Sequence, residues 1–430
     1  MHKLKNIIIF IDSYNDVDHI LPFIDYVLLN QKAKIILYRA KKSDLSGCVD
    51  HLKYLQTTYG LIPVNYDQFF SKKYTVFMNV YWKLLAFSNR AKQNSYLLLF
   101  LILVSRLRFV VIYLTRQEVN RVQENINADI IMMDNGKETS LYGSAIVKYA
   151  QNKSIATVGY LHGFSIYTNT DTLQKDKIVL NPVKKLILRL SKPAVIPTYF
   201  DRYVTGIRQK KSFFSSSQMP HFEECYLSRV LEVGMPRFSK EWIFKYKEKV
   251  IRSQGFTYGD TNKINVILFM SHPQYNVLAD ELMATIKILS SCNTINFVYK
   301  PHTRNGLDRI NLKKLNGYDA SKVSSLELSS WADVGIVYGS SVAFQLLNDD
   351  VPLIMPKYLH LNTTIFEENN VCIVVNNINE MISIFSKTKK EISDMIIRKN
   401  VSKFIRNYVY GGNDYSSLMK DFYRSSVGFK

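Results

Sequence analysis

Short runs of apolar, largely β-branched residues alternate with helix-length segments along the whole chain, in the first half and again in the second. A continuous apolar run of about four to eight residues is typical of a strand buried on both faces of a parallel sheet. In the first half the predicted strands are NIIIFID (6–12), KIILYR (34–39), ADIIMMDNG (128–136), SIATVGY (154–160) and a short run at 202–205. In the second half they are KINVILFMS (263–271), NTINFVYK (293–300), ADVGIVYG (332–339), VPLIMP (351–356) and VCIVV (371–375).

The order strand, turn, helix, strand defines a βαβ unit with a right-handed crossover, so we predict the α/β class with parallel sheets. The 430 residues are enough for about two or three domains. We expect two Rossmann-like domains whose sheets face a cleft, at residues 1–226 and 227–400, followed by helices over 401–430 that could pack back on the first domain. Ligands of such proteins bind at the carboxyl ends of strands, so motifs at those ends carry the functional argument.

The charge balance predicts an anionic partner, because Lys and Arg outnumber Asp and Glu by 56 to 36 and the net charge is +20. Nucleic acid, an acidic membrane surface and a phosphorylated substrate are the alternatives. The positive charge is spread along the chain and no nucleic-acid-binding module is found, so we predict that nucleic acid is not the partner. The four cysteines lie far apart, which fits neither a zinc site nor a disulfide framework and favours a reducing compartment.

Two apolar segments bear on membrane insertion. The N-terminal run has only five apolar residues before Asp12, which is too short for the core of a signal peptide. The most apolar stretch, 96–114, contains Arg106 and Arg108, whereas a spanning helix needs about 20 nearly uncharged residues. A transmembrane helix is therefore not expected. A helix buried in the protein is favoured, a helix lying on the bilayer is the alternative, and the basic segment 184–211 is a second candidate for membrane contact.

The segment NFVYKPHTR follows an apolar strand with three potential cations, Lys300, His302 and Arg304. Pro301 lacks a backbone donor and so ends the strand ladder. Cations gathered at a strand end suit a phosphate or a diphosphate, although a solvated basic turn has the same composition.

A second motif follows the strand that ends at Tyr338, where Gly339 turns the chain and Ser340 and Ser341 open a helix. The free N–H groups at a helix N-terminus favour an anion, and hydroxyl side chains there can donate to it. The alternative is that the serines only cap the helix. We expect the two motifs to lie at adjacent strand ends and to form one pocket for a nucleotide phosphate.

Polar residues also end two strands of the first half. GYLHGFSIYTN places His162 and Gly163 after a strand, where the histidine could act as a base or a hydrogen-bond donor, or be structural. Asp134 ends the preceding strand and should be a neighbour of His162. Asp134 could attack an anomeric carbon or accept a proton, or it could only cap the next helix. Glu138 is either its acid/base partner or a solvated helix residue.

Further candidates lie in loops that should face the same region. Arg237 in VGMPRF follows a strand at the domain crossing, where it could meet a donor phosphate or carboxylate. His272 follows the first strand of the second domain. The segment 355–368 could contribute contacts to donor or acceptor, or be an ordinary surface loop. The residues expected to line the acceptor side are Gly163, Asn169, His360 and Asn362.

The motif K-P-H, followed by A-D-V-x-x-x-x-x-S-S-V and then V-P-L-I, resembles the donor domain of the GT-B glycosyltransferases that build bacterial surface polysaccharides. The set is similar to the capsule β-Kdo transferases and, more distantly, to the CDP-glycerol and CDP-ribitol polymerases of teichoic acids. The H-G pair at 162–163 resembles the acceptor-domain dipeptide of the same families. The chain departs from the pattern at Thr303, where proline is usual, and at Gln345, where an acidic residue often contacts the nucleotide ribose.

The resemblance implies a glycosyltransferase without metal or cofactor that uses a nucleotide sugar of the CMP-Kdo type to build a capsule, an O-antigen or another surface polysaccharide. It implies that the K-P-H and S-S segments hold the donor phosphate and that Asp134 is the nucleophile. The implied acceptor is lipid-linked or an oligosaccharide, at the inner face of a bacterial cytoplasmic membrane. The alternatives are a CDP-polyol phosphotransferase, for which W-H-G-T would be expected where the chain reads LHGF, and a non-catalytic partner in polysaccharide assembly.

Overall fold

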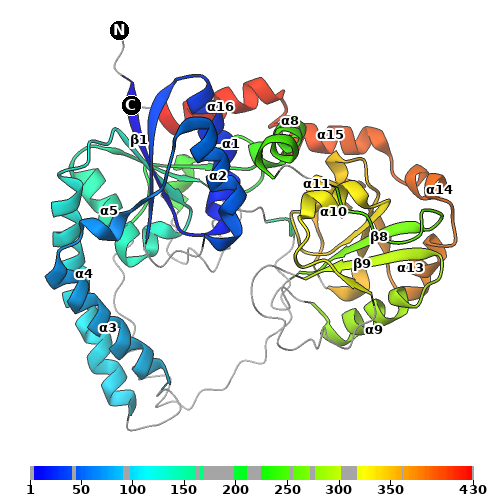
Figure 1. Ribbon diagram of the computed structural model, residues 1–430, viewed down its shortest axis with the longest axis horizontal. Coiled ribbons are helices and arrows are strands. Elements are labelled where there is room, and N and C mark those ends of the chain that lie inside the picture. The colour runs from blue at the N-terminus through cyan, green and yellow to red at the C-terminus, as the bar shows by residue number, and fades with distance from the viewer. Residues whose placement is uncertain are drawn as a thin grey trace.

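The computed structural model describes residues 4–40, 45–90, 97–160, 165–168, 198–210, 224–251, 255–271, 277–301, 317–360 and 362–428. This part of the chain forms two α/β domains, each built on one sheet (Figure 1). All strand pairs in the two sheets are parallel. The α/β class with parallel sheets, predicted from the alternating apolar runs, is therefore confirmed.

The first sheet has seven strands in the order β3-β2-β1-β4-β5-β6-β7. Their bounds are β1 (Lys5–Ile11), β2 (Ala33–Arg39), β3 (Val64–Asn65), β4 (Ile130–Asp134), β5 (Ala156–Tyr160), β6 (Arg202–Thr205) and β7 (Val230–Glu232). Ile8 of β1 lies in register between Ile36 of β2 and Ile131 of β4. Every residue of β4 and β5 is buried, as expected for strands covered on both faces.

Helices cover both faces of the first sheet, which explains why the run at 7–11 holds no polar residue. Ile7 and Ile9 pack in a core with α1 (Tyr14–Leu29) and α2 (Val49–Tyr59). Ile8 points to the opposite face and packs with α4 (Leu97–Gln123) and α5 (Leu141–Asn152). Successive side chains of a strand alternate between faces, so both sets must be apolar when both faces are buried.

The second sheet has six strands in the order β10-β9-β8-β11-β12-β13, which repeats the order of the first sheet without its last strand. Their bounds are β8 (Ile264–Phe269), β9 (Ile295–Lys300), β10 (Tyr318–Asp319), β11 (Val334–Val337), β12 (Leu353–Pro356) and β13 (Ile373–Val375). The helices of this domain are α9 (Ala279–Ser290), α10 (Ser325–Trp331), α11 (Ala343–Asn348), α12 (Ile365–Glu368), α13 (Ile378–Ile384) and α14 (Lys389–Asp394).

The strand order corrects one expectation about the two phosphate-binding motifs. Lys300 ends β9 and Ser340 follows β11, but β8 lies between these strands and pairs with both. The two motifs are therefore not at adjacent strand ends. In a doubly wound sheet, strands are added on both sides of the first strand. β9 therefore lies on one side of β8 and β11 on the other.

The chain crosses between the domains through two segments that touch each other. Beyond β7, which extends the first sheet to Glu232, the backbone N–H of Met235 donates to the carbonyl of Val409 (2.8 Å). Gly234 and Gly411 both have positive φ, and a Cβ on Gly234 would lie 2.6 Å from the Val409 oxygen. A Cβ on Gly411 would lie 2.1 Å from the oxygen of Val233. Only glycine permits this approach of the two crossings.

The segments beside these crossings are shared between the domains. α8 (Lys240–Lys245) packs in the core of the first domain through Trp242, whereas Phe238 just before it belongs to the core of the second. α15 (Arg398–Tyr408) packs in the second domain, and α16 (Tyr415–Val427) packs on the first through Phe422. Both ends of the described chain therefore lie on the first domain (Figure 1).

A hairpin of two long helices, α3 (Lys72–Arg90) and α4, projects downward in Figure 1 from the side of the first domain that is far from the second. The expectation that 96–114 is a buried helix holds only in part for its described side chains. Val111 is buried against α3, whereas Leu107, Phe109, Val110 and Tyr113 are exposed. Among the residues described, no helix is both long and apolar enough to cross a membrane.

Candidate active site

The strand order reverses once in each sheet, between β1 and β4 in the first domain and between β8 and β11 in the second. Doubly wound sheets bind their ligands beyond the carboxyl ends of the strands at this point. In the first domain the residues there include Asp12 and Asp134, and in the second they include Ser271 and Gly339. The described residues of the sequence-predicted motifs, at 134, 271 and 339–341, therefore stand where this fold binds ligands.

A short segment, Ser165–Thr168, joins the two domains in front of these strand ends, and we call it the strap. Its Ser165 is held by Gln209 of the first domain through two hydrogen bonds, of 2.9 and 3.1 Å. Its other end pairs with the second domain as an antiparallel bridge between Tyr167 and Thr364. The strap starts at residue 165, five positions after the end of β5, and its Tyr167 pairs with the second domain.

Gly339 is the position where the strap meets the second domain most closely. Its φ is +70°, and a Cβ there would lie 2.2 Å from the hydroxyl oxygen of Tyr167. Ser271 donates a hydrogen bond to the carbonyl of Tyr338, which ties the loop after β8 to the loop after β11. The glycine predicted from sequence as a turn is thus also required by contact with the strap.

His360 lies beside this junction and is 1% exposed. Its ring is stacked 6.3 Å from that of Tyr338 and lies 6.5 Å from that of Tyr167. Neither ring nitrogen has a hydrogen-bond partner among the described residues. Burial lowers the pKa of His360 to about 4, so the imidazole is neutral at pH 7. A buried polar ring without partners costs free energy, and such a group at a ligand-binding edge is a candidate for contact with a ligand.

Two carboxylates lie at the corresponding edge of the first domain. Asp134 ends β4 opposite Tyr160 of β5 and is 2% exposed. Glu138 lies in the short 3-10 turn after β4, is fully buried, and accepts a hydrogen bond from the hydroxyl of Tyr203 (3.2 Å). The interpretation of Glu138 as a solvated helix residue is therefore wrong. Burial raises its pKa to about 7, and the nearby charge of Asp134 adds to this effect.

Lys137, between these two carboxylates in the sequence, is turned toward the first strand. Its ammonium donates to Asp12 (3.0 Å) and lies 4.0 Å from Asp16. Asp16 in turn caps the start of α1. Lys137 thus neutralises part of the negative charge of Asp12 and Asp16, which lie where the first sheet reverses its strand order.

The predicted phosphate ligands of the second domain have observed partners within that domain. The ammonium of Lys300 donates to the carbonyls of Ala320, Ser321 and Val323, at 3.4, 3.3 and 2.5 Å. Burial lowers the pKa of Lys300. In this conformation Lys300 holds the loop before α10. Ser340 is half-buried, and its hydroxyl accepts a hydrogen bond from the backbone of Val342 (3.4 Å).

Other predicted donor-site residues are engaged in the core or in loops. Gln345 is buried, and its amide donates to the carbonyl of Ser325 (2.7 Å), which joins α11 to α10. The carbonyl of Asn362 accepts from Lys357 (2.9 Å), whose ammonium also contacts Glu367 (3.0 Å). The loop 357–367 that carries His360 is therefore fixed by an internal ion pair and is not an ordinary surface loop. Ser341 is half-buried beside Ser340.

Arg237 lies in a buried ion pair of the first domain. Its Nε donates to Asp18 of α1 (2.6 Å), and His51 contacts the other oxygen of Asp18 (3.2 Å). Tyr246 completes the network through its hydroxyl, 2.6 Å from His51 Nε2. Although burial opposes it, Arg237 and His51 hold the pKa of Asp18 well below its usual range. This pairing offsets the charge of Arg237 within the first domain, while its Nη1 has no hydrogen-bond partner among the described residues.

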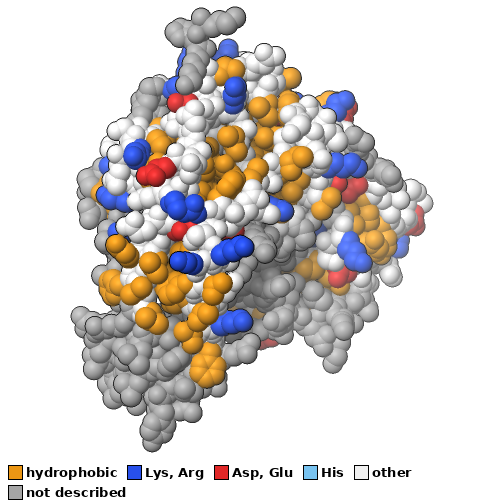
Figure 2. All heavy atoms as spheres, turned by 60° about the vertical axis from the view of Figure 1, so that its left-hand side comes forward, with side chains coloured by type: hydrophobic (Ala, Val, Ile, Leu, Met, Phe, Trp, Pro, Cys, Tyr) orange, Lys and Arg blue, Asp and Glu red, His pale blue; other side chains and the backbone are white. Residues whose placement is uncertain are grey.

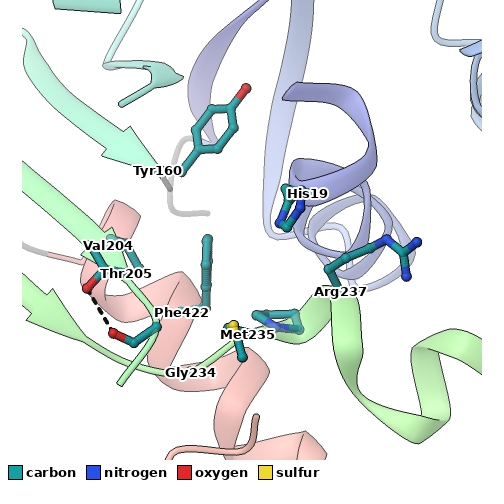
Figure 3. A pocket seen from close by; sticks show the side chains of 10 residues that line it. His19, Tyr160, Val204, Thr205, Gly234, Met235, Arg237 and Phe422 are labelled. Atoms are coloured by element: carbon teal, nitrogen blue, oxygen red, sulfur yellow. Dashed lines mark hydrogen bonds between the residues drawn. The ribbon is translucent and has the colours of Figure 1, made fainter. Parts of the chain in front are cut away.

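A small pocket lies beside this network, at the carboxyl ends of β5 and β6 and against α16 (Figure 3). Tyr160, Thr205 and His19 line it together with Met235 of the crossing. The guanidinium of Arg237 points away from Tyr160 and Met235 (Figure 3). The pocket therefore meets the carbon chain of Arg237 rather than its charge.

Several predicted site residues lie outside the described residues. They are His162, Gly163, Asn169, His272, His302 and Arg304. Their roles stay predictions, as do the roles of Asp134, Lys300 and the serines in chemistry. Sequence reasoning missed Tyr167, Tyr338 and Ser271 as contacts of the junction. Only their position next to the motifs at 162–163, 339–341 and 272 could have pointed to them.

No protein-family model matches the chain, and no curated protein matches it in sequence. Solved structures share its fold over nearly the whole length. The glycosyltransferase of kitacinnamycin is 12% identical with a TM-score of 0.50, and the match covers 99% of this chain and 100% of that one. A UDP-N-acetylglucosamine 2-epimerase is 10% identical with a TM-score of 0.52, covering 100% and 98%. The UDP-GlcNAc 2-epimerase of Neisseria meningitidis, bound to UDP-GlcNAc, is 12% identical with a TM-score of 0.51, covering 97% and 100%.

These likenesses establish the fold. The chain has the GT-B-like architecture of two Rossmann-like domains that the sequence motifs predicted, and it shares this architecture with a glycosyltransferase and with epimerases that act on a nucleotide sugar.

The raised pKa of Glu138 predicts a pH-dependent stability. The folded protein binds the proton of Glu138 more tightly than the unfolded chain, whose glutamate has an ordinary pKa near 4.5. The contribution of Glu138 to the free energy of unfolding is therefore fully present below pH 4.5, and it is lost as the pH rises through the folded-state pKa of about 7. We expect Glu138→Gln to raise the free energy of unfolding at pH 8 by up to about 3 kcal/mol and to change it little at pH 4. Urea denaturation at both pH values measures this, with exposed Glu124→Gln as control. A uniform effect at both pH values would contradict it.

The buried pair of Arg237 and Asp18 predicts a loss of stability when the cation is removed. Arg237→Gln leaves the Asp18 carboxylate buried with too little compensation, and we expect a loss of about 3 kcal/mol in urea denaturation. Arg208→Gln is the matched control, because the pair of Arg208 with Glu368 is exposed and should contribute less than about 1 kcal/mol. Unchanged stability with weakened donor binding would return Arg237 to the role predicted from sequence.

Proposed function

We propose that this protein is a nucleotide-sugar-dependent glycosyltransferase whose second domain binds the donor. The observation that carries the proposal is His360, a buried neutral imidazole without a hydrogen-bond partner among the described residues. Its ring stacks on Tyr338, which precedes Gly339 and accepts a hydrogen bond from Ser271, at the strand ends where this fold binds ligands. A ligand that supplies a donor and an acceptor to the ring would satisfy a group that the described protein leaves unsatisfied.

The donor of this proposal is a CMP-Kdo-type nucleotide sugar. The support is the ordered set of three motifs in the second domain. K-P-H begins at the last residue of β9, S-S follows β11, and V-P-L-I leads into β12. The phosphate would lie over Gly339, Ser340 and Ser341, in the turn between β11 and α11. His302 and Arg304 would add charge to this pocket. Lys300 would support it through the loop 320–323 that its ammonium holds.

The chemistry proposed for the first domain needs one carboxylate and one proton carrier. Asp134 would attack the anomeric carbon or remove the proton of the acceptor hydroxyl, while the nucleotide phosphate leaves with the electron pair of the broken bond. Glu138, whose pKa is raised to about 7 by burial, can hold or release a proton near neutral pH. His162 would contact the donor group or act as the second acid/base residue. No cofactor takes part in this scheme.

The acceptor of the proposal is a lipid-linked saccharide or an oligosaccharide of a bacterial capsule, O-antigen or related polymer. Such acceptors are assembled at the inner face of the cytoplasmic membrane, where a protein of net charge +20 is attracted to anionic lipid. We therefore propose a peripheral position on that membrane.

Two other reactions fit the same fold and are separated by one assay. A CDP-polyol phosphotransferase would attack phosphorus rather than carbon, and would release CMP from a CDP-polyol. An epimerase, the activity named for two of the similar structures, would return an altered nucleotide sugar without any acceptor. Incubation with CMP-Kdo, CDP-glycerol and UDP-GlcNAc, with and without an oligosaccharide acceptor, distinguishes the three. Release of CMP from CMP-Kdo that depends on acceptor supports the proposal.

The role of His360 predicts a separation of binding from stability. We expect His360→Phe to keep the fold, because the ring loses no hydrogen bond to a described residue, and to weaken binding of CMP by about tenfold or more. Calorimetric titration with CMP measures this. His51→Phe is the matched control, since His51 is equally buried but bonded to Asp18 and Tyr246, so it should lower stability and leave CMP affinity unchanged. Equal CMP affinity in wild type and His360→Phe would reject the site.

The role of Asp134 predicts a loss of catalysis without a loss of nucleotide binding. Asp134→Asn should lower kcat by about 10²–10⁴-fold while the affinity for CMP stays near that of the wild type. Single-turnover transfer from CMP-Kdo and titration with CMP give the two quantities. An equal loss in both would contradict a division of labour between the domains, and an unchanged kcat would remove Asp134 from the chemistry.

A further inference from the structure

The helical hairpin α3–α4 has a charge composition unlike that of the rest of the chain. The fifty residues from Gln68 to Gln117 contain no Asp or Glu, whereas the chain average of 36 acidic residues in 430 would place about four there. The same stretch holds eight cations, which are Lys72, Lys73, Lys83, Arg90, Lys92, Arg106, Arg108 and Arg116. A basic segment without counter-charges of its own is suited to an extended anionic surface.

The hairpin also exposes large apolar side chains that its own packing does not need. Tyr74, Met78 and Tyr81 of α3 pack against Val111 of α4 in a closed seam. The exposed apolar residues lie on the remaining faces, with Tyr113 62% and Phe109 54% exposed. Eight of the large hydrophobic residues found exposed in the described structure belong to the hairpin, namely Val76, Val80, Trp82, Phe87, Leu107, Phe109, Val110 and Tyr113.

Apolar and basic side chains share one face of α3. Val76, Val80 and Phe87 follow one another at spacings of four and seven residues, which places them along one stripe of the helix. Lys72 and Lys83 fall on the same stripe and are exposed. In Figure 2, which brings this side of the molecule forward, hydrophobic side chains gather in the lower part beside Lys and Arg side chains. An apolar stripe bordered by cations is the pattern of a helix that lies in a membrane interface.

We propose that the α3–α4 hairpin is the membrane-docking element of this protein and that its partner is the surface of a bilayer containing anionic phospholipid. Exposed aromatic and aliphatic side chains enter the boundary between headgroups and acyl chains, and the lysines and arginines meet lipid phosphates. The hairpin lies on the surface rather than spanning it, in agreement with the absence of a spanning helix among the described residues. The inference rests on the proposed function in one respect, which is that a lipid-linked acceptor gives the docking its purpose.

The position of the hairpin joins it to the candidate carboxylates. Tyr142 of α5 stacks on Phe70 at the base of α3, with ring centroids 5.5 Å apart. α5 begins directly after the turn that carries Glu138. Docking through the hairpin therefore brings the acceptor-side domain, and not the donor-side domain, against the bilayer.

Charge argues against the two competing partners. A second copy of the chain that paired through the same face would oppose basic residues to basic residues, which is unfavourable in a two-fold interface. An acidic polysaccharide would explain the cations but not the exposed Phe109 and Tyr113. Only an anionic bilayer offers an apolar layer and a layer of negative charge in the same surface.

The test is co-sedimentation of the full chain with vesicles of phosphatidylcholine alone and of phosphatidylcholine with about one third phosphatidylglycerol. We expect binding to the anionic vesicles that falls with added salt. Replacing Lys72, Lys73 and Lys83 by Gln should weaken it by about tenfold or more. Phe87→Ser, Phe109→Ser and Tyr113→Ser combined should weaken it to a similar extent.

The matched charge control replaces Lys287, Lys399 and Lys403 by Gln, since these exposed lysines lie on the second domain. Phe244→Ser controls for loss of an exposed aromatic outside the hairpin. Both controls should bind as the wild type does. Equal binding of hairpin variants and wild type, or an equal loss in the controls, would overturn the proposal. The proposal would also be overturned if light scattering showed a dimer of the wild-type protein and only monomers of the hairpin variants.

CMP binding measured without vesicles keeps this inference separate from the proposed function. The hairpin variants should bind CMP as the wild type does, because the hairpin lies outside the second domain. A wild-type protein that binds anionic vesicles through the hairpin but binds no nucleotide would reject the glycosyltransferase and leave the docking surface in place. A protein that binds CMP but no vesicle would reject the docking surface and leave the proposed function in place.

Discussion

The close contact between the two interdomain crossings is the constraint on which the arrangement of this protein depends. Gly234 and Gly411 let the segment after β7 lie against the segment after α15, and the Met235 hydrogen bond to Val409 joins them. A side chain at either glycine would place a Cβ within contact distance of a carbonyl oxygen. The strap adds a third connection, from Gln209 through Tyr167 to Thr364. The domains are therefore held together at two places, at the paired crossings and at the strap. The strand ends that carry the candidate site lie near the strap.

Burial determines the protonation of the groups at those strand ends. His360 is held neutral and Glu138 is brought to a pKa of about 7 because each loses solvent without gaining a full opposite charge. Asp18, which is as deeply buried, keeps its charge because Arg237 and His51 contact it directly. The contrast separates a structural ion pair from groups that can exchange a proton with a substrate. It also explains why Arg237 contributes to the fold, whereas His360 is the better candidate for contact with a ligand.

The order and type of the secondary structure could be predicted from the sequence, and part of the site could not. Runs such as 6–12 and 263–271 became central strands, since a strand covered on both faces leaves a continuous apolar signature. The two-residue strands β3 and β10 were missed, because edge strands this short carry no period to detect. Lys300 and Ser340 were expected as neighbours because their strands seemed consecutive, but the doubly wound order inserts β8 between them.

The sequence by itself determined the α/β class, the parallel strands and the motifs at their ends, because hydrophobic periodicity and local turn chemistry depend on neighbours in the chain. It also determined the acid-free basic stretch from 68 to 117. Only the tertiary structure decided which polar groups are satisfied. Glu138, Gln345 and Arg237 have partners from distant segments, at Tyr203, Ser325 and Asp18, and His360 has none among the described residues. Burial and pairing arise from contacts between residues far apart in the chain, and no local pattern encodes them.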